Sequence, residues 1–404
     1  MAGRLLALDG LRGLLALYIL AGHTLPFLDL PPRVASLGTC ASHGRGAVDL
    51  FFILSGLVIL GSLDQISATP RPAMRFLLAR AGRLLPVYGL ALALAAGALS
   101  LGDPFSAMTW LPASGAAHEI LEAGWPMPWF WHLTAHALLL QGLLPPALLS
   151  DAEFSILGPA WSLSTEWQFY ALAALALAVR GGAVTSAAQL RHWLGGLMLL
   201  ALLGLGNGLL PPEWRFGRAF LPQEAWYFAL GIASFALLRR PQDREARLLF
   251  AMTLAAACAF SWFATQADAV LVPLVWALCL SCQARELAPR FAQAALRQGY
   301  RLLTSPCLLW AGRISYSLYL THAPVQRLLM LWLAPGAGGD WSRFTLAWAG
   351  PAIALPLLVA LLVHHMVEEP LRRRRHGRPG DKGASRVSPP LCASGSNTSA
   401  GGRP

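Results

Sequence analysis

Apolar runs long enough to cross a lipid bilayer recur along almost the whole chain, and this feature limits the fold more than any other. The hydrocarbon core of a bilayer is about 30 Å thick, and about 20 helical residues cross it. Backbone groups in that core must be hydrogen-bonded internally, which favours helices. Only 13% of the residues are charged, whereas a soluble domain has about 25%. The sequence therefore predicts an all-α polytopic membrane protein.

Ten of these runs are expected to be transmembrane helices. They cover residues 5–27, 48–63, 84–101, 161–179, 193–210, 220–238, 248–264, 269–280, 314–333 and 344–363. A cleaved signal peptide is an alternative for the first run, but Asp9 and Arg12 lie inside it and no small-x-small cleavage site follows. We therefore expect a retained first span, and both chain ends on one side of the membrane.

An eleventh apolar segment, residues 129–149, is expected not to cross the membrane. It contains His132 and His136. If it does not cross, most of the 31 Lys and Arg residues fall on the cytoplasmic side, as the positive-inside bias requires; a crossing would reverse that bias downstream. Residues 102–160, which contain no Lys or Arg, then form a long outward region. The sequence predicts a re-entrant or interfacial helix at 129–149.

The chain divides into an integral-membrane unit, residues 1–371, and a tail, residues 372–404. The tail begins with four arginines and continues in Gly, Ser and Pro, so we expect it to be basic, disordered and cytoplasmic. The net charge of +11 comes from short basic clusters between apolar runs, without interleaved aromatic residues. This pattern is typical of the cytoplasmic ends of membrane-spanning helices and argues against a nucleic-acid partner. We expect the protein to lie in the plasma (inner) membrane, in contact with lipid.

Two polar side chains face the same way on the first predicted helix. Arg12 and His23 are eleven residues apart, which at about 100° and 1.5 Å per residue returns the helix to within roughly 20° and separates them by about 16 Å. Ionisable residues inside a membrane are costly and usually mark functional sites. One helix face therefore presents a cation near one membrane surface and an imidazole near the other.

Short polar motifs follow one another in a fixed order along the spans. They are Asp9-Gly-Leu-Arg-Gly with His23, Gly46-Ala-Val-Asp49-Leu-Phe-Phe-Ile-Leu-Ser55-Gly56, Arg80-Ala-Gly-Arg83-Leu-Leu-Pro86, Trp161-Ser-Leu-Ser-Thr-Glu166-Trp-Gln-Phe-Tyr170, Ile314-Ser-Tyr316-Ser-Leu-Tyr319-Leu-Thr-His322 and Glu368-Glu369-Pro370. Over residues 4–371 this series resembles the acyltransferase-3 family of membrane O-acyltransferases.

The resemblance implies about ten spans and transfer of an acyl group, commonly acetyl from acetyl-CoA, to hydroxyl groups of exported carbohydrates or, in some branches, macrolides. Some members also carry an extracytoplasmic hydrolase-like domain after the last span. We find no such domain in this sequence, so a hand-off of that kind would need a separate extracytoplasmic transferase.

Arg12 and His23 match the basic residue and histidine of the family's first helix. The transfer needs a base that removes a hydroxyl proton, and imidazole suits this near neutral pH. The resemblance therefore implies that His23 is the general base. A hydrogen bond from His23 to a neighbouring helix is the alternative. Arg12 either orients the site and meets the donor or is neutralised by Asp9.

Arg80 and Arg83 match the family's paired arginines. Three residues apart, they share one helix face at the expected inner mouth of the third span, where cytoplasmic acyl-CoA arrives. Guanidinium groups bind phosphate oxygens through paired hydrogen bonds. We expect them to bind acyl-CoA together with Arg12. Simple anchoring at the inner surface is the alternative, as for Arg71 and Arg75.

Two carboxylates and three aromatic or imidazole side chains complete the candidate site. Asp49 and Glu166, near the outer ends of their helices, are expected either to orient the imidazole of His23 or position the acceptor, or to cap the helices. His322 precedes Pro324 by two residues, and such a polar kink usually lines a cavity. His322, Tyr316 and Trp161 are the candidates for acceptor binding, with interface anchoring as the alternative for Trp161.

No metal site is predicted, because His132 and His136 lack a third ligand at a recognisable spacing. The sequence leaves direct transfer and a ping-pong route open. A multi-span transporter or flippase for a glycan or lipid-linked intermediate is the alternative function, since buried charges also occur in carriers. It would predict repeated halves, which we do not see. A non-catalytic scaffold gives no reason to bury Arg12 and His23.

Overall fold

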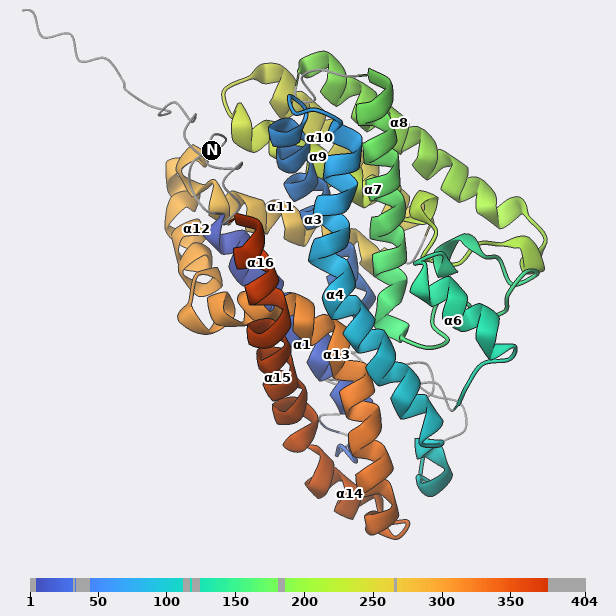
Figure 1. Ribbon diagram of the computed structural model, residues 1–404. Coiled ribbons are helices and arrows are strands. Elements are labelled where there is room, and N and C mark those ends of the chain that lie inside the picture. Colours follow the sequence, from blue (N-terminus) through green and yellow to red (C-terminus); the bar gives the residue numbers. More distant parts are fainter. Residues whose placement is uncertain are drawn as a thin grey trace, which may run out of the picture.

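The computed structural model describes residues 5–31, 33, 44–111, 117, 124–180, 186–264 and 267–376. Within these ranges all regular elements are helical and no strand occurs (Figure 1). The all-α prediction is confirmed for this part of the chain. The predicted disordered tail lies outside the described residues from position 377 onward.

Each of the ten predicted spans overlaps one or two helices. The longer helices are α1 (Leu6–Thr24), α3 (Gly44–Ile66), α4 (Pro72–Ser100), α7 (Trp161–Arg180), α8 (Ala187–Gly206), α9 (Ala225–Arg239), α10 (Arg244–Ala264), α11 (Leu271–Gln283), α13 (Pro306–Ala337) and α15 (Pro351–Val363). The shorter ones are α6 (Trp129–Ala137), α12 (Arg290–Leu303), α14 (Trp341–Trp348), a π-helical turn (His364–Glu368) and α16 (Glu369–His376). Short 3-10 turns occur at Leu25–Phe27, Pro104–Ala107, Gln141–Leu143, Gly158–Ala160, Asn207–Leu209, Pro212–Trp214, Leu221–Gln223, Ala267–Val270 and Arg285–Leu287.

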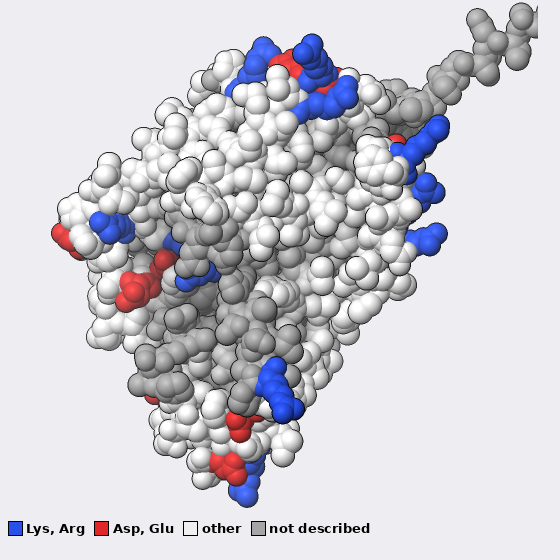
Figure 2. All heavy atoms as spheres, turned by 180° about the vertical axis from the view of Figure 1, so that it is seen from behind, with Lys and Arg blue, Asp and Glu red and all other residues white. Residues whose placement is uncertain are grey.

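Six helical stretches of the described chain are long and apolar enough to cross a membrane. They are Leu6–Phe27, Gly44–Ile66, Pro72–Ser100, Ala187–Leu209, Arg244–Phe263 and Trp341–Arg373, and α9 and α11 are shorter apolar helices. Large apolar side chains face outward, for example Leu209, Phe263 and Trp332. Figure 2 shows large areas without charged side chains, with basic and acidic side chains together at the upper end of the view and others at its left and lower parts. Such a surface suits lipid, and ten crossings remain a prediction.

Two segments differ from uniform spans. The expected span at 344–363 is divided into α14 and α15, and α15 begins at Pro351, whose missing N–H cannot continue a helical hydrogen-bond ladder. The segment 129–149 forms only the nine-residue helix α6 followed by turns. A helix of this length is about 14 Å long and cannot cross the hydrocarbon core, in agreement with the sequence analysis.

Glycines bring α1 against α13 along a tight seam. A Cβ atom at Gly13 would lie 2.2 Å from the carbonyl oxygen of Leu308, and one at Gly312 would lie 2.2 Å from that of Asp9. Gly10 is closer still to the end of α12, with 1.6 Å to the carbonyl oxygen of Leu303. Small residues allow membrane helices to approach this closely. The Asp9-Gly-Leu-Arg-Gly motif thus holds Arg12 and His23 against α13.

A second close contact joins α3 to α9. A Cβ atom at Gly56 would lie 2.3 Å from the carbonyl oxygen of Phe228, and one at Gly231 would lie 2.1 Å from that of Ile53. The ring of Phe52 of α3 also packs against that of Trp161 of α7, with centroids 5.6 Å apart. These contacts fix α3 between α7 and α9, so that one face of α3 forms a wall of the cavity described next.

Candidate active site

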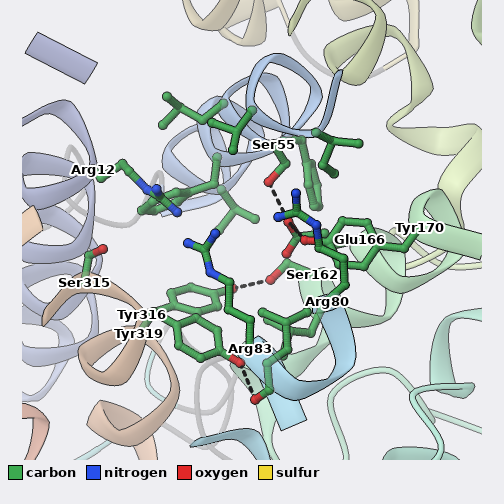
Figure 3. Close-up of a pocket in the computed structure, with 18 residues that line it drawn as sticks. Arg12, Ser55, Arg80, Arg83, Ser162, Glu166, Tyr170, Ser315, Tyr316 and Tyr319 are labelled. Carbon is green, nitrogen blue, oxygen red and sulfur yellow. Dashed lines mark hydrogen bonds between the residues drawn. The ribbon is translucent and has the colours of Figure 1, made fainter. Parts of the chain in front are cut away.

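A cavity lies between α1, α3, α4, α7 and α13 (Figure 3). It encloses about 770 Å³ of space free of protein atoms, part of it open to the outside. Its wall on α3 is mostly apolar, and its other walls are polar. The polar lining residues are Arg12, Ser55, Arg80, Arg83, Ser162, Glu166, Tyr170, Ser315, Tyr316 and Tyr319. Four residues predicted at the site from the sequence, His23, His322, Asp49 and Trp161, do not line it.

Three guanidinium groups face this cavity, against one carboxylate. Arg12 comes from α1, Arg80 and Arg83 come from α4, and Glu166 comes from α7 (Figure 3). The Nε atom of Arg12 is buried and has no hydrogen-bond partner in the described part of the chain. The guanidinium of Arg80 lies 5.4 Å from the ring centroid of Phe76. The excess of positive charge makes the cavity suited to an anionic ligand.

Hydrogen bonds fix the carboxylate of Glu166 on the arginine side of the cavity. Ser55 donates to its Oε1 atom at 2.7 Å, and the hydroxyl of Tyr170 donates to the same atom. Glu166 is one turn inside α7, so its side chain meets the arginines rather than the level of His23. The structure therefore places this residue with the candidate donor-binding groups.

His23 and His322 lie against each other, from α1 and α13. Their ring centroids are 4.7 Å apart and their planes are perpendicular. The Nδ1 atom of His322 lies 3.1 Å from the carbonyl oxygen of Leu318 and must be the donor there, which leaves Nε2 with a free lone pair. This Nε2 and the Nδ1 of His23 are buried without hydrogen-bond partners in the described part of the chain. The pair can accept a proton from a hydroxyl group.

A ladder of rings on α13 connects the cavity to the histidine pair. Tyr316, Tyr319 and His322 follow at intervals of three residues and so share one helix face. Tyr316 and Tyr319 line the cavity, and the hydroxyl of Tyr316 donates to the carbonyl oxygen of Leu84 at 2.8 Å. The ring centroid of Tyr319 lies 6.2 Å from that of His322. Tyr319 thus lines the arginine cavity and also lies beside His322.

Asp49 and Trp161 belong to a separate buried group around Arg218. Arg218 forms ion pairs with Asp49 at 2.9 Å and with Glu224 at 3.1 Å, and it lies over the ring of Trp161 at 5.2 Å. Burial alone would lower the pKa of Arg218, but the two carboxylates outweigh it and raise the pKa. Asp49 thus shares Arg218 with Glu224, and its expected action on His23 stays a prediction.

His132 and His136, considered above as metal ligands, lie on α6 next to Ser155. The Nδ1 atom of His132 is 2.8 Å from the hydroxyl of Ser155, and the Nε2 atom of His136 is 3.1 Å from the carbonyl oxygen of Ala152. Among the described residues, no group of three or more His, Cys, Asp or Glu side chains is arranged to hold a metal ion.

Five polar residues that line the cavity were not predicted as site residues: Ser55, Ser162, Tyr170, Ser315 and Tyr319. All five lie inside the motifs quoted from the sequence. Tyr170 follows Glu166 by four residues, and Tyr319 follows Tyr316 by three, so helical spacing already places each on the face of its predicted neighbour. That spacing was a signal available from sequence.

Comparison with known proteins identifies the family. The family model for the acyltransferase domain of the acyltransferase-3 type matches residues 5–365, nearly the whole chain. The chain belongs to this family, and with its apolar helices it is an integral-membrane acyltransferase. The chain is also 33% identical over 174 residues to "Protein 2 in picA locus" of Rhizobium radiobacter, which covers 40% of this chain and 77% of that protein. No solved structure matches the chain.

Proposed function

We propose that this protein moves an acyl group, acetyl in the simplest case, from cytoplasmic acyl-CoA to a hydroxyl group of an exported carbohydrate or other glycosylated acceptor. The observation that carries this proposal is the convergence of Arg12, Arg80 and Arg83 on one cavity with Glu166 as its single carboxylate. Coenzyme A carries several phosphate charges, and paired guanidinium groups are the side chains best suited to them.

The chemistry follows from the neighbouring histidines. The acceptor oxygen attacks the thioester carbonyl carbon, the carbon–oxygen bond forms, and the carbon–sulfur bond breaks. An imidazole of the His23 and His322 pair takes the hydroxyl proton, and the departing thiolate receives a proton as coenzyme A leaves. The unpartnered nitrogen atoms of this pair support the role of His23 as general base.

The proposed arrangement gives each substrate its own side of the membrane. The donor enters from the cytoplasm at Arg80 and Arg83, and the acceptor approaches the histidine pair from the outside of the plasma membrane, with both chain ends cytoplasmic. The basic segments between the helices support this topology, which requires the ten predicted crossings. Any later transfer of the acyl group to another acceptor would need a separate extracytoplasmic transferase as a partner.

Equilibrium binding of acetyl-CoA to the purified full-length protein tests the donor site. Because each lost charged hydrogen bond costs about 1.5–3 kcal/mol, the Arg80→Ala, Arg83→Ala double variant should weaken binding by about a hundredfold or more. The matched control is Arg71→Ala with Arg75→Ala, at the start of the same helix, where both side chains are exposed and outside the cavity. Equal loss in the two double variants, or none in the first, would contradict the proposal.

A further inference from the structure

Tyr319 lies at the boundary between the two halves of the candidate site. Its side chain lines the arginine cavity, whereas His23 and His322 do not. Its ring centroid lies 6.2 Å from that of His322 and also 6.2 Å from that of Phe51 on the opposite wall. Figure 3 shows Tyr319 beside Tyr316 at the α13 wall of the cavity. Tyr319 is therefore a lining residue at which the arginine cavity borders the histidine pair.

Hydrogen bonds hold the Tyr319 ring in this place. Its hydroxyl donates to the carbonyl oxygen of Pro159 at 2.9 Å and lies 2.8 Å from the hydroxyl of Ser162. Ser162 in turn donates to the same Pro159 oxygen at 3.2 Å. The anchor is therefore the 3-10 turn Gly158–Ala160 and the first turn of α7, not α13 itself.

That anchor is fastened to the segment expected to face outward. The side-chain amide of Gln141 donates to the carbonyl oxygen of Ala160 at 3.1 Å, and Ser164 donates to the carbonyl oxygen of Leu139 at 2.8 Å. Residues 139–141 directly follow the short helix α6. A ligand that shifts the outward region near α6 would thus move the groups that hold Tyr319.

We propose that Tyr319 is a positioning residue that keeps the acyl group apart from the histidine pair, and so determines whether that group goes to an acceptor hydroxyl or to water. The proposal rests on the proposed acyl-CoA-dependent function. An acceptor that binds from outside moves the turn at Pro159, the ring withdraws, and the thioester meets the activated hydroxyl. Without an acceptor the ring stays anchored and water activated by the imidazoles does not reach the thioester.

Removal of the ring should therefore open a hydrolytic leak. In that side reaction water attacks the thioester carbonyl carbon, the carbon–sulfur bond breaks, and acetate and the free thiol of coenzyme A are released. The experiment incubates the purified full-length protein in lipid nanodiscs with acetyl-CoA and no acceptor, and follows free thiol with a thiol-reactive dye. Tyr319→Ala should raise the rate by about tenfold, which corresponds to about 1.4 kcal/mol of activation free energy.

Three further variants separate this role from a merely structural one. Tyr319→Phe keeps the ring but loses the anchor and should leak less than Tyr319→Ala. The combination of Tyr319→Ala with His23→Ala should return to the wild-type rate, because the leak needs an imidazole. The matched control is Tyr227→Phe, which loses a buried hydroxyl that lies 3.2 Å from the hydroxyl of Ser261, outside the cavity. This variant should not leak.

The outcomes distinguish this inference from the proposed function. If Tyr319→Ala folds poorly, Tyr319→Leu replaces it. If Tyr319→Ala binds acetyl-CoA as tightly as wild type but releases thiol no faster, the proposed role of Tyr319 is overturned, whereas the proposed donor site is not affected. A wild-type protein that binds no acetyl-CoA overturns both. Retention of the leak after His23→Ala would overturn the assignment of the imidazoles as the groups that Tyr319 screens.

Discussion

The two histidines at the end of the α13 ladder are costly residues for a membrane protein. Each buried polar atom without a partner costs about 1–3 kcal/mol, and both His23 and His322 carry one in the described part of the chain. A purely structural pair could hydrogen-bond to each other, but their rings meet edge to face instead. This arrangement leaves one nitrogen atom of each ring unpartnered, as the proposed catalytic role requires.

Loss of the imidazole at position 23 should abolish acyl transfer without loss of membrane expression. His23→Ala removes the proposed base, and its site lies beside a tight helix seam that does not depend on the ring. Activity should fall by about 10²-fold or more, measured as acetylated product per amount of folded protein. His365→Ala, an exposed histidine outside the cavity, is the control. Retention of more than a few per cent of the activity would remove His23 from the role of base.

The two candidate carboxylates show what a sequence can and cannot predict at this scale. Asp49 and Glu166 have the same sequence character, because each lies near the start of an apolar helix. Their environments differ because Asp49 pairs with Arg218, which lies 169 residues later in the sequence. Arg218 lies in a loop that has no periodic sequence pattern. Helical spacing predicts neighbours on one helix but not such a partner, so only the structure separates the two roles.

At the scale of helices, the seam between α1 and α13 sets the geometry of the site. The glycines Gly13 and Gly312 let the two backbones touch, and the same two helices carry Arg12, His23 and the ring ladder. Gly13 lies inside a sequence motif, but its partner Gly312 lies about 300 residues away and outside every motif, so their contact could not be predicted from sequence. Distances between catalytic groups therefore depend on this packing.

A single methyl group in the seam should loosen it. Gly312→Ala would place a Cβ atom 2.2 Å from the carbonyl oxygen of Asp9, so the helices must separate, at a cost of about 1–3 kcal/mol. Gly196→Ala on α8 makes the same change where nothing lies within 4 Å. Thermal unfolding should show a lower midpoint for the first and an unchanged or higher midpoint for the second. Equal midpoints for the two variants would show that α1 and α13 can separate without loss of stability.

Amphipathic helices were the elements least visible from sequence. The helix α12 falls in a stretch that we expected only to be a basic inner segment, because its arginines interrupt every apolar run. Its buried residues, Leu296 and Leu303, are seven apart and lie on one face. A scan for long apolar runs passes over such a helix, whereas a scan for helical periodicity would find it.

At the scale of the whole molecule, charge bias and hydropathy predicted the class, and the ordered motifs predicted the family. The helices confirm the first and the family match confirms the second. The side of the membrane on which each loop lies remains a prediction, because the length and hydropathy of a helix do not give its orientation in the membrane. The short helix α6 is the point at which an alternative topology would diverge.

Labelling of a cysteine placed after α6 tests that topology. Ser150→Cys, at an exposed position, should react in intact cells with a thiol reagent that cannot cross membranes. Gln242→Cys, exposed between α9 and α10, should react only after the cells are opened. Labelling of the wild-type protein gives the baseline, since Cys307 is also exposed. Protection of the cysteine at position 150 in intact cells would overturn the ten-span map.

The arginine cavity has a consequence for cell physiology. If its three guanidinium groups hold the phosphates of the donor as proposed, they hold the same phosphates after the acyl group has left. Free coenzyme A then competes with acyl-CoA for the same binding site, and the rate of turnover depends on the ratio of their cytoplasmic concentrations. Acylation of exported acceptors would then slow whenever the ratio of acyl-CoA to free coenzyme A falls, without the need for a separate regulator.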